Sequence, residues 1–185
     1  MLNSPNQSNN SLTDMEIFNN NGAEFSDCKK FRYKLWRIWD NELPKAMCIG
    51  LNPSTANESN NDPTISALSK ALKKLGYGGL YMVNLFSIIS SNPEILLDVN
   101  VKMNTLENDI KLAETHLLCK DVIVCWGAFK QATNRVKEVL PRYPDALCFG
   151  KNSDGTPEHP MFSLVYKKNK PELKLIPFNP PIINN

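Results

Sequence analysis

The feature that most constrains the fold is a short, continuous apolar run, Ala46 to Leu51 (AMCIGL), bounded by turn residues. A run that is apolar on both alternating faces is typical of a strand covered on both sides, as in a parallel sheet. Three similar runs follow, at 80–89, 121–126 and 146–149. Segments with helical spacing alternate with them, at 64–75, 103–119 and 128–140. This alternation predicts an α/β fold, a three-layer α/β/α sandwich with a central, mainly parallel four-stranded sheet.

The segments outside this alternation complete the predicted organisation. The aromatic, β-prone stretch 31–39 precedes a turn at 41–44, and it predicts an additional N-terminal strand or hairpin. Residues 1–22 are rich in Asn and Ser and predict a flexible tail. We therefore expect one α/β domain over residues 23–170 and a Pro-rich C-terminal extension over 171–185.

Two of the predicted helices carry specific expectations. The helix at 64–75 has an apolar face, with Asp62 or Thr64 as its N-terminal cap and Gly76 at its end. The helix at 103–119 is predicted to be amphipathic, and four of its residues form the predicted apolar face: Leu106, Ile110, Ala113 and Leu117.

Composition narrows the functional classes. The 185 residues are 42% hydrophobic and 22% charged, which is ordinary for a globular protein. No apolar run approaches the roughly 18 residues of a membrane helix, and the N-terminus has no apolar signal core, so we expect a cytoplasmic protein with no membrane partner. The five cysteines form no Cys-x-x-Cys pair, so we expect free thiols, no metal and no cofactor.

The charge pattern leaves two interpretations of one segment open. A net charge of +2 is too small to indicate nucleic-acid binding by itself. Residues 28–37 (CKKFRYKLWR), however, mix basic and aromatic side chains that are suited to contact phosphates. The simpler interpretation, which we favour, is a half-buried strand with a solvated cationic face.

The ends of the predicted strands supply the candidate site residues. In an open parallel sheet, ligands bind outside the carboxyl ends of the strands. This rule selects four segments: Gly50–Asn57, Asn84–Phe86, Trp126–Ala128 and Gly150–Phe162.

The first segment, GLNPSTAN, is the most informative. Gly50 allows close backbone approach, Pro53 fixes a turn, and the Asn52 amide can both donate and accept hydrogen bonds. The segment matches neither a phosphate-binding P-loop nor a dinucleotide fingerprint. It is as consistent with a turn and helix cap as with a ligand site.

Three further residues also have two interpretations each. Asn84 interrupts an apolar run, so if its amide is buried it needs hydrogen-bond partners. Those partners are either the edge of a base or a neighbouring loop. His159 lies in a predicted loop, where a ligand-facing role is favoured. Asp62 is a general base or, as we favour, a helix cap. A triad of Ser54, His159 and an Asp lacks the Gly-x-Ser-x-Gly turn that such enzymes use.

Taken together, these motifs resemble the bacterial family named domain of unknown function 1643. The resemblance covers roughly residues 25–165. Its motifs are Phe31-Arg32-Tyr33 to Trp39-Asp40, Gly50 to Ala56, Asp62-Pro63-Thr64, Gly76 to Leu80, Val83 to Phe86, Trp126-Gly127, and Asp154-Gly155 to His159-Pro160.

The order of these motifs also resembles, more distantly, the uracil-DNA glycosylase superfamily. This resemblance implies that Asn52 positions the attacking water, that Asn84 reads an extruded base, and that His159 stabilises the departing base. Asp62 is a further catalytic candidate. The expected substrate-binding residues are Gly50, Leu51, Pro53, Ser54, Thr55, Asn84, Phe86, Trp126, Gly127 and Pro160.

The chain departs from that superfamily in two places. Residues 54–64 contain no aromatic side chain on which a base can stack, which leaves Tyr77, Phe86 or Phe162 as substitutes. The segment after His159-Pro160 reads Met161 to Leu164 in place of the usual strand-separating wedge.

The expected function follows from the second resemblance. We expect a glycosylase-like protein that binds a nucleobase, a nucleoside or nucleic acid, or hydrolyses its N-glycosidic bond. The alternatives are a non-catalytic nucleotide- or nucleic-acid-binding module on the same fold, and a small-molecule hydrolase that uses Asp62 or His159 as its base.

Overall fold

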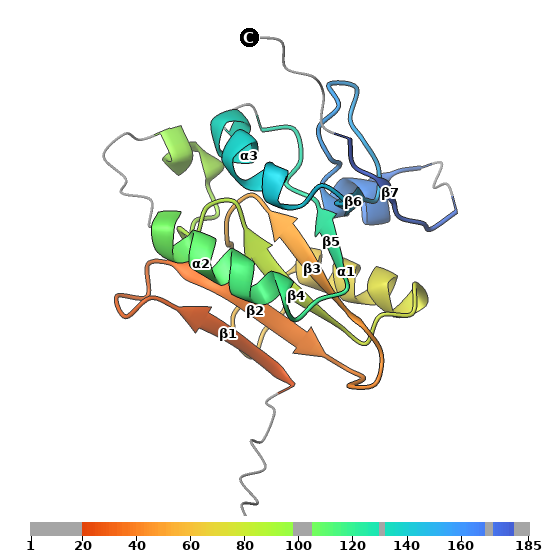
Figure 1. Ribbon diagram of the computed structural model, residues 1–185, viewed down its shortest axis with the longest axis horizontal. Coiled ribbons are helices and arrows are strands. Elements are labelled where there is room, and N and C mark those ends of the chain that lie inside the picture. Colours follow the sequence, from red (N-terminus) through yellow and green to blue (C-terminus); the bar gives the residue numbers. More distant parts are fainter. Residues whose placement is uncertain (1–19, 98–104, 130–131, 169–171, 180–185) are drawn as a thin grey trace, which may run out of the picture.

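The computed structural model describes residues 20–97, 105–129, 132–168 and 172–179. The predicted tail over 1–19, the start of the helix predicted at 103, and residues 180–185 of the predicted extension lie outside the described residues. The described chain forms a mixed α/β fold built on one seven-stranded sheet (Figure 1).

The sheet is wider than the sequence predicts. Its seven strands are β1 (Asn21–Phe25), β2 (Arg32–Ile38), β3 (Lys45–Gly50), β4 (Gly79–Asn84), β5 (Asp121–Val124), β6 (Leu147–Cys148) and β7 (Ile176–Pro177). They lie in the order β1-β2-β4-β3-β5-β6-β7. The neighbouring pairs β4–β3, β3–β5 and β5–β6 are parallel, and the pairs at the two sides of the sheet are antiparallel. Residues from both the predicted tail and the predicted extension therefore contribute edge strands.

The N-terminal hairpin is formed differently from the sequence expectation. The turn at 41–44 leads from β2 to β3, but these strands do not pair, because β4 lies between them. Gly78, just before β4, donates its amide to the Pro44 carbonyl, and its own carbonyl accepts hydrogen bonds from the amides of Trp39 and Asp40. The hairpin partner of β2 is β1.

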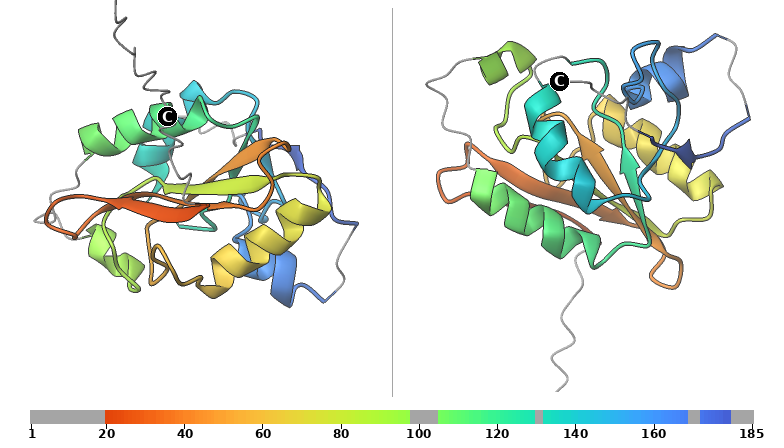
Figure 2. Two further views of the ribbon diagram at one scale, coloured as in Figure 1. Left: turned by 90° about the horizontal axis from the view of Figure 1, so that it is seen from below. Right: turned by 45° about the horizontal axis from the view of Figure 1, so that its top comes forward.

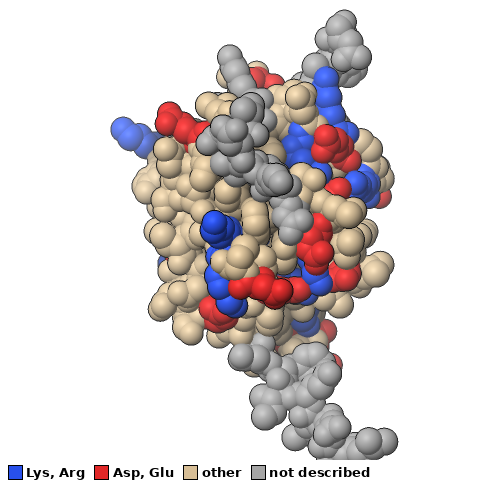
Figure 3. Space-filling model, turned by 90° about the vertical axis from the view of Figure 1, so that its left-hand side faces the viewer, with Lys and Arg blue, Asp and Glu red and all other residues tan. Residues whose placement is uncertain are grey.

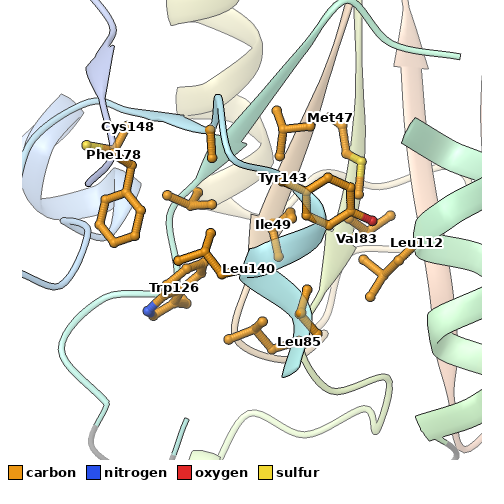
Figure 4. Packing of buried hydrophobic residues seen from close by; sticks show 14 of the residues in the cluster. Met47, Ile49, Val83, Leu85, Leu112, Trp126, Leu140, Tyr143, Cys148 and Phe178 are labelled. Carbon is orange, nitrogen blue, oxygen red and sulfur yellow. The ribbon is translucent and has the colours of Figure 1, made fainter. Parts of the chain in front are cut away.

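Alternating residues of the central strands build two cores, one on each face. On β3, Met47 and Ile49 belong to one cluster, whereas Ala46 and Cys48 belong to the other. Figure 2 shows helices on both sides of the sheet. In Figure 4, Met47, Ile49, Val83 and Leu85 face Leu112 of α2 (Thr105–His116) and Leu140 and Tyr143, which follow α3 (Thr133–Val139). The double coverage explains why β3 is apolar throughout.

Helix α1 (Pro63–Lys74) forms as the sequence predicts. Asp62 is its N-cap and accepts the Ile65 amide at 2.8 Å, Pro63 occupies the first turn, and Gly76 follows the helix with a φ of +83°. Its buried residues are Ile65, Leu68, Ala71 and Leu72, and all but Ala71 belong to the same core cluster as Ala46 and Cys48 of β3.

Helix α2 (Thr105–His116) buries a different face from the predicted one. Leu106 is 75% exposed, Ile110 is 45% exposed and Leu117, just after the helix, is 84% exposed. The buried residues are instead Asn108, Leu112 and Thr115. Asn108 faces the sheet because its amide donates to the carbonyls of Asn84 and Leu85, at 3.0 and 3.2 Å.

The remaining helices are short. α3 (Thr133–Val139) continues into the 3-10 turn η3 (Leu140–Arg142), so the helix begins later than the predicted residue 128. A 3-10 turn η1 (Pro93–Leu97) follows β4, and a π-helical turn η4 (Met161–Tyr166) follows His159-Pro160. Among the described helices, none has the length and apolar character needed to cross a membrane.

Candidate functional site

A cavity of about 390 Å³ opens at the edge where the parallel strands β3, β4 and β5 end. All four segments selected from the sequence contribute to it. The predicted residues that line it are Gly50, Leu51, Asn52, Ser54, Thr55, Asp62, Asn84, Trp126 and His159. Pro53, Phe86, Gly127 and Pro160 were also predicted, but they are not among the lining residues.

Asn84 stands out among the lining residues because it is buried and unsatisfied. It is 1% exposed, and neither its Nδ2 nor its Oδ1 has a hydrogen-bond partner among the described residues. Buried polar side chains nearly always have a partner. The interpretation in which this amide bonds a neighbouring loop therefore finds no partner in the part of the chain that the structure describes.

Gly50 makes room for this amide. It lies opposite Asn84 in the parallel register of β3 and β4. A Cβ atom on Gly50 would lie 2.8 Å from Asn84 Oδ1 and 2.5 Å from Met82 Cε. Any larger residue here would displace the Asn84 side chain.

Two helices fix the backbone around Asn84. Asn108 of α2 donates to the Asn84 and Leu85 carbonyls, and Arg135 of α3 donates its Nε to Leu85 at 2.9 Å. Arg135 is held in turn by Asp109 and by Glu138. Although burial alone would raise the pKa of Asp109, hydrogen bonds from Arg135 and Arg142 hold it below its usual value.

Asn52 has its nitrogen anchored. Its Nδ2 donates to the carbonyls of Ser90, Pro53 and Ile88, at 2.8, 3.2 and 3.5 Å. These bonds tie the loop after β3 to the segment after β4. They also turn Oδ1 away from those carbonyls, so the oxygen is available as an acceptor.

Asp62 serves as the cap that the sequence favours, and it also lines the cavity. One carboxylate oxygen is occupied by the Ile65 amide. Its charge acts at longer range on three groups: Arg32, Arg37 and His159.

Arg32 lines the cavity and was not identified from the sequence as a site residue. It begins β2, which is antiparallel to β4, so it lies at the edge where β4 ends, and its amide bonds Ser87. The side chain is 2% exposed, Nη1 donates to the Ala56 carbonyl, and Nε has no partner among the described residues. Burial lowers the pKa of Arg32 to about 10, with Asp62 acting in the opposite direction.

Neither interpretation of the basic stretch 28–37 describes its arginines. Arg37 is 6% exposed and donates to the carbonyls of Asn57, Asn60 and Trp36 and to the Asn61 side chain. Like Arg32, Arg37 therefore holds the 56–61 loop in place. The lysine on the same strand, Lys34, forms an ion pair with Glu24 at 2.9 Å. The predicted solvated cationic face is therefore wrong for both arginines.

His159 follows β6 and approaches the end of β5. Its Nδ1 accepts the Met161 amide at 3.3 Å, which leaves the proton of a neutral ring on Nε2. The residue as a whole is solvent exposed, but desolvation of the imidazole lowers its pKa, while Asp62 raises it. Gly127, with a φ of +82°, permits the approach, because a Cβ there would lie 3.3 Å from His159 Cβ.

The aromatic side chains at the cavity differ from the predicted substitutes. Tyr77, Phe86 and Phe162 are not among the lining residues, and Tyr77 instead bonds Asp121 at 2.8 Å. Three other aromatic residues line the cavity: Trp126, Phe129 and Tyr166. Trp126 is largely committed to the core, where it packs against Phe178.

The other lining residues come from the start of α1, from β4, from the segment after β4, from the residue just after β5 and from the start of η4. They are Pro63, Thr64, Ile65, Met82, Ser90, Ser91, Pro93, Cys125 and Met161. Burial raises the pKa of Cys125 to about 12, so this thiol stays protonated. Within the described ranges, no group of three His, Cys, Asp or Glu side chains is arranged to hold a metal ion.

Comparison with known proteins places the chain in a family. A family model described as a protein of unknown function (DUF1643) matches residues 32–161, and the chain belongs to this family. Searches of curated proteins and of solved structures found no match.

Proposed function

We propose that this member of the DUF1643 family binds a nucleobase in the cavity and hydrolyses its N-glycosidic bond, in a nucleoside or in nucleic acid. The observation that carries the proposal is the buried, unpaired amide of Asn84. An amide presents one donor and one acceptor side by side, which complements the edge of a base. A ring in this cavity would satisfy both atoms.

Asn52 and His159 supply the chemistry that glycosidic cleavage needs. The reaction develops positive charge on the sugar and negative charge on the base, so it requires a positioned water and a donor to the base. With Nδ2 anchored on Ser90, Asn52 offers Oδ1 to orient the water. A neutral His159 offers its Nε2 proton to the departing base.

Stacking and architecture also support the proposal. Phe129 and Tyr166 line the cavity and provide aromatic faces for a planar ring. The uracil-DNA glycosylase-like arrangement of the parallel strands belongs to this proposal, because the order of Asn52, Asn84 and His159 along the chain resembles that superfamily.

The substrate panel should include small molecules as well as DNA. On the face in Figure 3, acidic and basic side chains are interspersed without a continuous basic stripe outside the grey atoms. A free nucleoside does not need such a stripe, whereas a nucleic acid generally binds one.

Base release tests the proposal. Deoxyuridine, deoxyinosine, and oligonucleotides that carry uracil or hypoxanthine are incubated with the protein, and the free base is quantified. We expect Asn52→Ala and His159→Gln to lower kcat about 100-fold each. Asn41→Ala, in an exposed turn, is the matched control and should retain full turnover. Equal turnover in Asn52→Ala and wild type would contradict the mechanism.

A binding module without catalysis is the second candidate. The carboxylate that lines the cavity, Asp62, already caps α1 and is therefore poorly placed to act as a base. A ligand at 100 times its dissociation constant would stabilise the fold by about 2.7 kcal/mol. Stabilisation by a base or nucleotide without release of any base would favour this second candidate.

A further inference from the structure

The cavity contains a second buried polar group without a partner, in addition to Asn84. Nε of Arg32 makes no hydrogen bond among the described residues, although the side chain is 2% exposed. Arg32 and Asn84 line the same cavity, together with Gly50 and Met82. An unpaired buried charge is more costly than an unpaired buried amide.

Arg32 also lacks a counter-ion. Within the described part of the chain, no carboxylate oxygen comes within salt-bridge distance of it, whereas Arg135 pairs with both Asp109 and Glu138. Asp62 acts on Arg32 only at longer range, and the neighbouring Arg37 adds positive charge. This end of the cavity therefore carries a positive charge that no carboxylate among the described residues pairs with directly, although Asp62 lines the same cavity.

We propose that the end of the cavity formed by Arg32 and Asn84 binds the negatively charged edge of a planar heterocycle: a ring that bears a carboxylate, or one that has lost an N–H proton. Arg32 neutralises the charge, and Asn84 supplies directional hydrogen bonds. That the ligand is a planar ring rests on the proposed function, whereas the negative charge of that ring goes beyond it.

The chemistry of the neighbouring residues favours such a ring over a phosphate. A phosphate is usually held by several donors at once, such as successive backbone amides. Here the unpartnered groups are one guanidinium nitrogen and one amide, both planar, and their neighbours include the apolar side chains of Met82, Ile65 and Phe129. Planar groups with apolar surroundings suit a flat anion.

Calorimetric titration of matched ring pairs tests the inference. Orotate differs from uracil by one carboxylate, and urate, which is ionised at neutral pH, differs from the mostly neutral xanthine by one carbonyl oxygen. Because hydrogen bonds to charged groups are stronger than neutral ones, wild type should bind each charged ring at least about tenfold more tightly than its neutral partner. This comparison needs no variant.

Variants then show which residue creates the preference for charged rings. Arg32→Met should reduce it to less than about twofold, since the charge that creates it is gone. Arg37→Met is the matched control: it removes another buried arginine of β2 that holds the same loop but does not line the cavity, so the preference should persist. Circular dichroism confirms that both variants fold.

The possible results separate this inference from the proposed function. Equal affinity of wild type for uracil and orotate, or a preference that survives in Arg32→Met, overturns the inference and leaves the base site intact. Benzoate that binds as tightly as orotate supports the charged end and overturns base recognition. If no ring or anion binds, both proposals fail.

Discussion

Two buried arginines that contact the chain just after β4 differ in how fully they are paired. Arg135 is 4% exposed, and its Nε, Nη1 and Nη2 bond Leu85, Glu138 and Asp109. Arg32 is 2% exposed, yet its Nε has no partner among the described residues. The two side chains are about equally buried, but they differ in their hydrogen-bond and charge partners.

The difference separates a structural site from a candidate binding site. Around Arg135, the protein satisfies its own polar groups and fixes the end of β4. Around Arg32 and Asn84, polar groups stay unsatisfied beside a cavity. Folded proteins retain such groups at a cost in stability, and we propose that a ligand satisfies them.

The largest expected effect is the difference in stability between two arginine variants. Arg135→Met should lower the free energy of unfolding by about 3 kcal/mol, because it breaks a buried ion pair. Arg32→Met should lower it by less than about 1 kcal/mol, because it also removes an uncompensated buried charge. Urea unfolding of both variants measures the difference, and equal losses would show that Arg32 is as structural as Arg135.

The next effect concerns the space beside Asn84. Gly50→Ala should lower the free energy of unfolding by about 2 kcal/mol, because its Cβ overlaps Met82 and the Asn84 amide. It should also abolish ring binding. Gly76→Ala is the control: it has open space but a φ of +83°, so it should cost about 1 kcal/mol through backbone strain and leave binding unchanged. Ring binding by Gly50→Ala at wild-type affinity would argue against a role for Asn84.

A smaller effect separates the two roles of Asp62. Asp62→Ala removes the cap of α1 and should lower the free energy of unfolding by about 1 kcal/mol. Asp62→Asn keeps a capping oxygen and should be nearly as stable as wild type. Thermal unfolding of the pair tests this; an equal loss in both variants would mean that the charge, not the cap, stabilises the helix.

The smallest effect is on pH dependence. Because Asp62 raises the pKa of His159, Asp62→Asn should lower that pKa further below its usual value, as an NMR titration of the imidazole would show. Since the folded pKa lies below the unfolded value of about 6.5, the unfolded chain binds more protons between the two. The contribution of His159 to stability is therefore fully present above about pH 6.5 and is lost as the pH falls towards the pKa of the folded state. His159→Gln should remove this part of the slope, and an unchanged slope would contradict the assignment.

Local sequence rules predicted much of this architecture correctly. The apolar run at 46–51 became β3, with alternate residues in two cores, because double coverage leaves no polar face. Asp62 and Gly76 frame α1 as capping chemistry predicts. The strand-end rule also brought Asn52, Asn84 and His159 to one cavity.

The remaining features depend on tertiary contacts that periodicity cannot reveal. α2 turns Asn108 inward because two carbonyls at the end of β4 need donors, and this exposes Leu106 and Ile110. Arg32 reaches the cavity only because β2 pairs with β4 in an antiparallel register. No local pattern around residue 32 signals that pairing.

A crystal structure of the protein with orotate bound tests the central claim most directly. The account predicts the ring in the cavity, with both polar atoms of the Asn84 amide within hydrogen-bond distance of its edge and the carboxylate beside Arg32. A ring bound elsewhere, or an Asn84 side chain that turns to bond protein groups while the cavity stays empty, would contradict it.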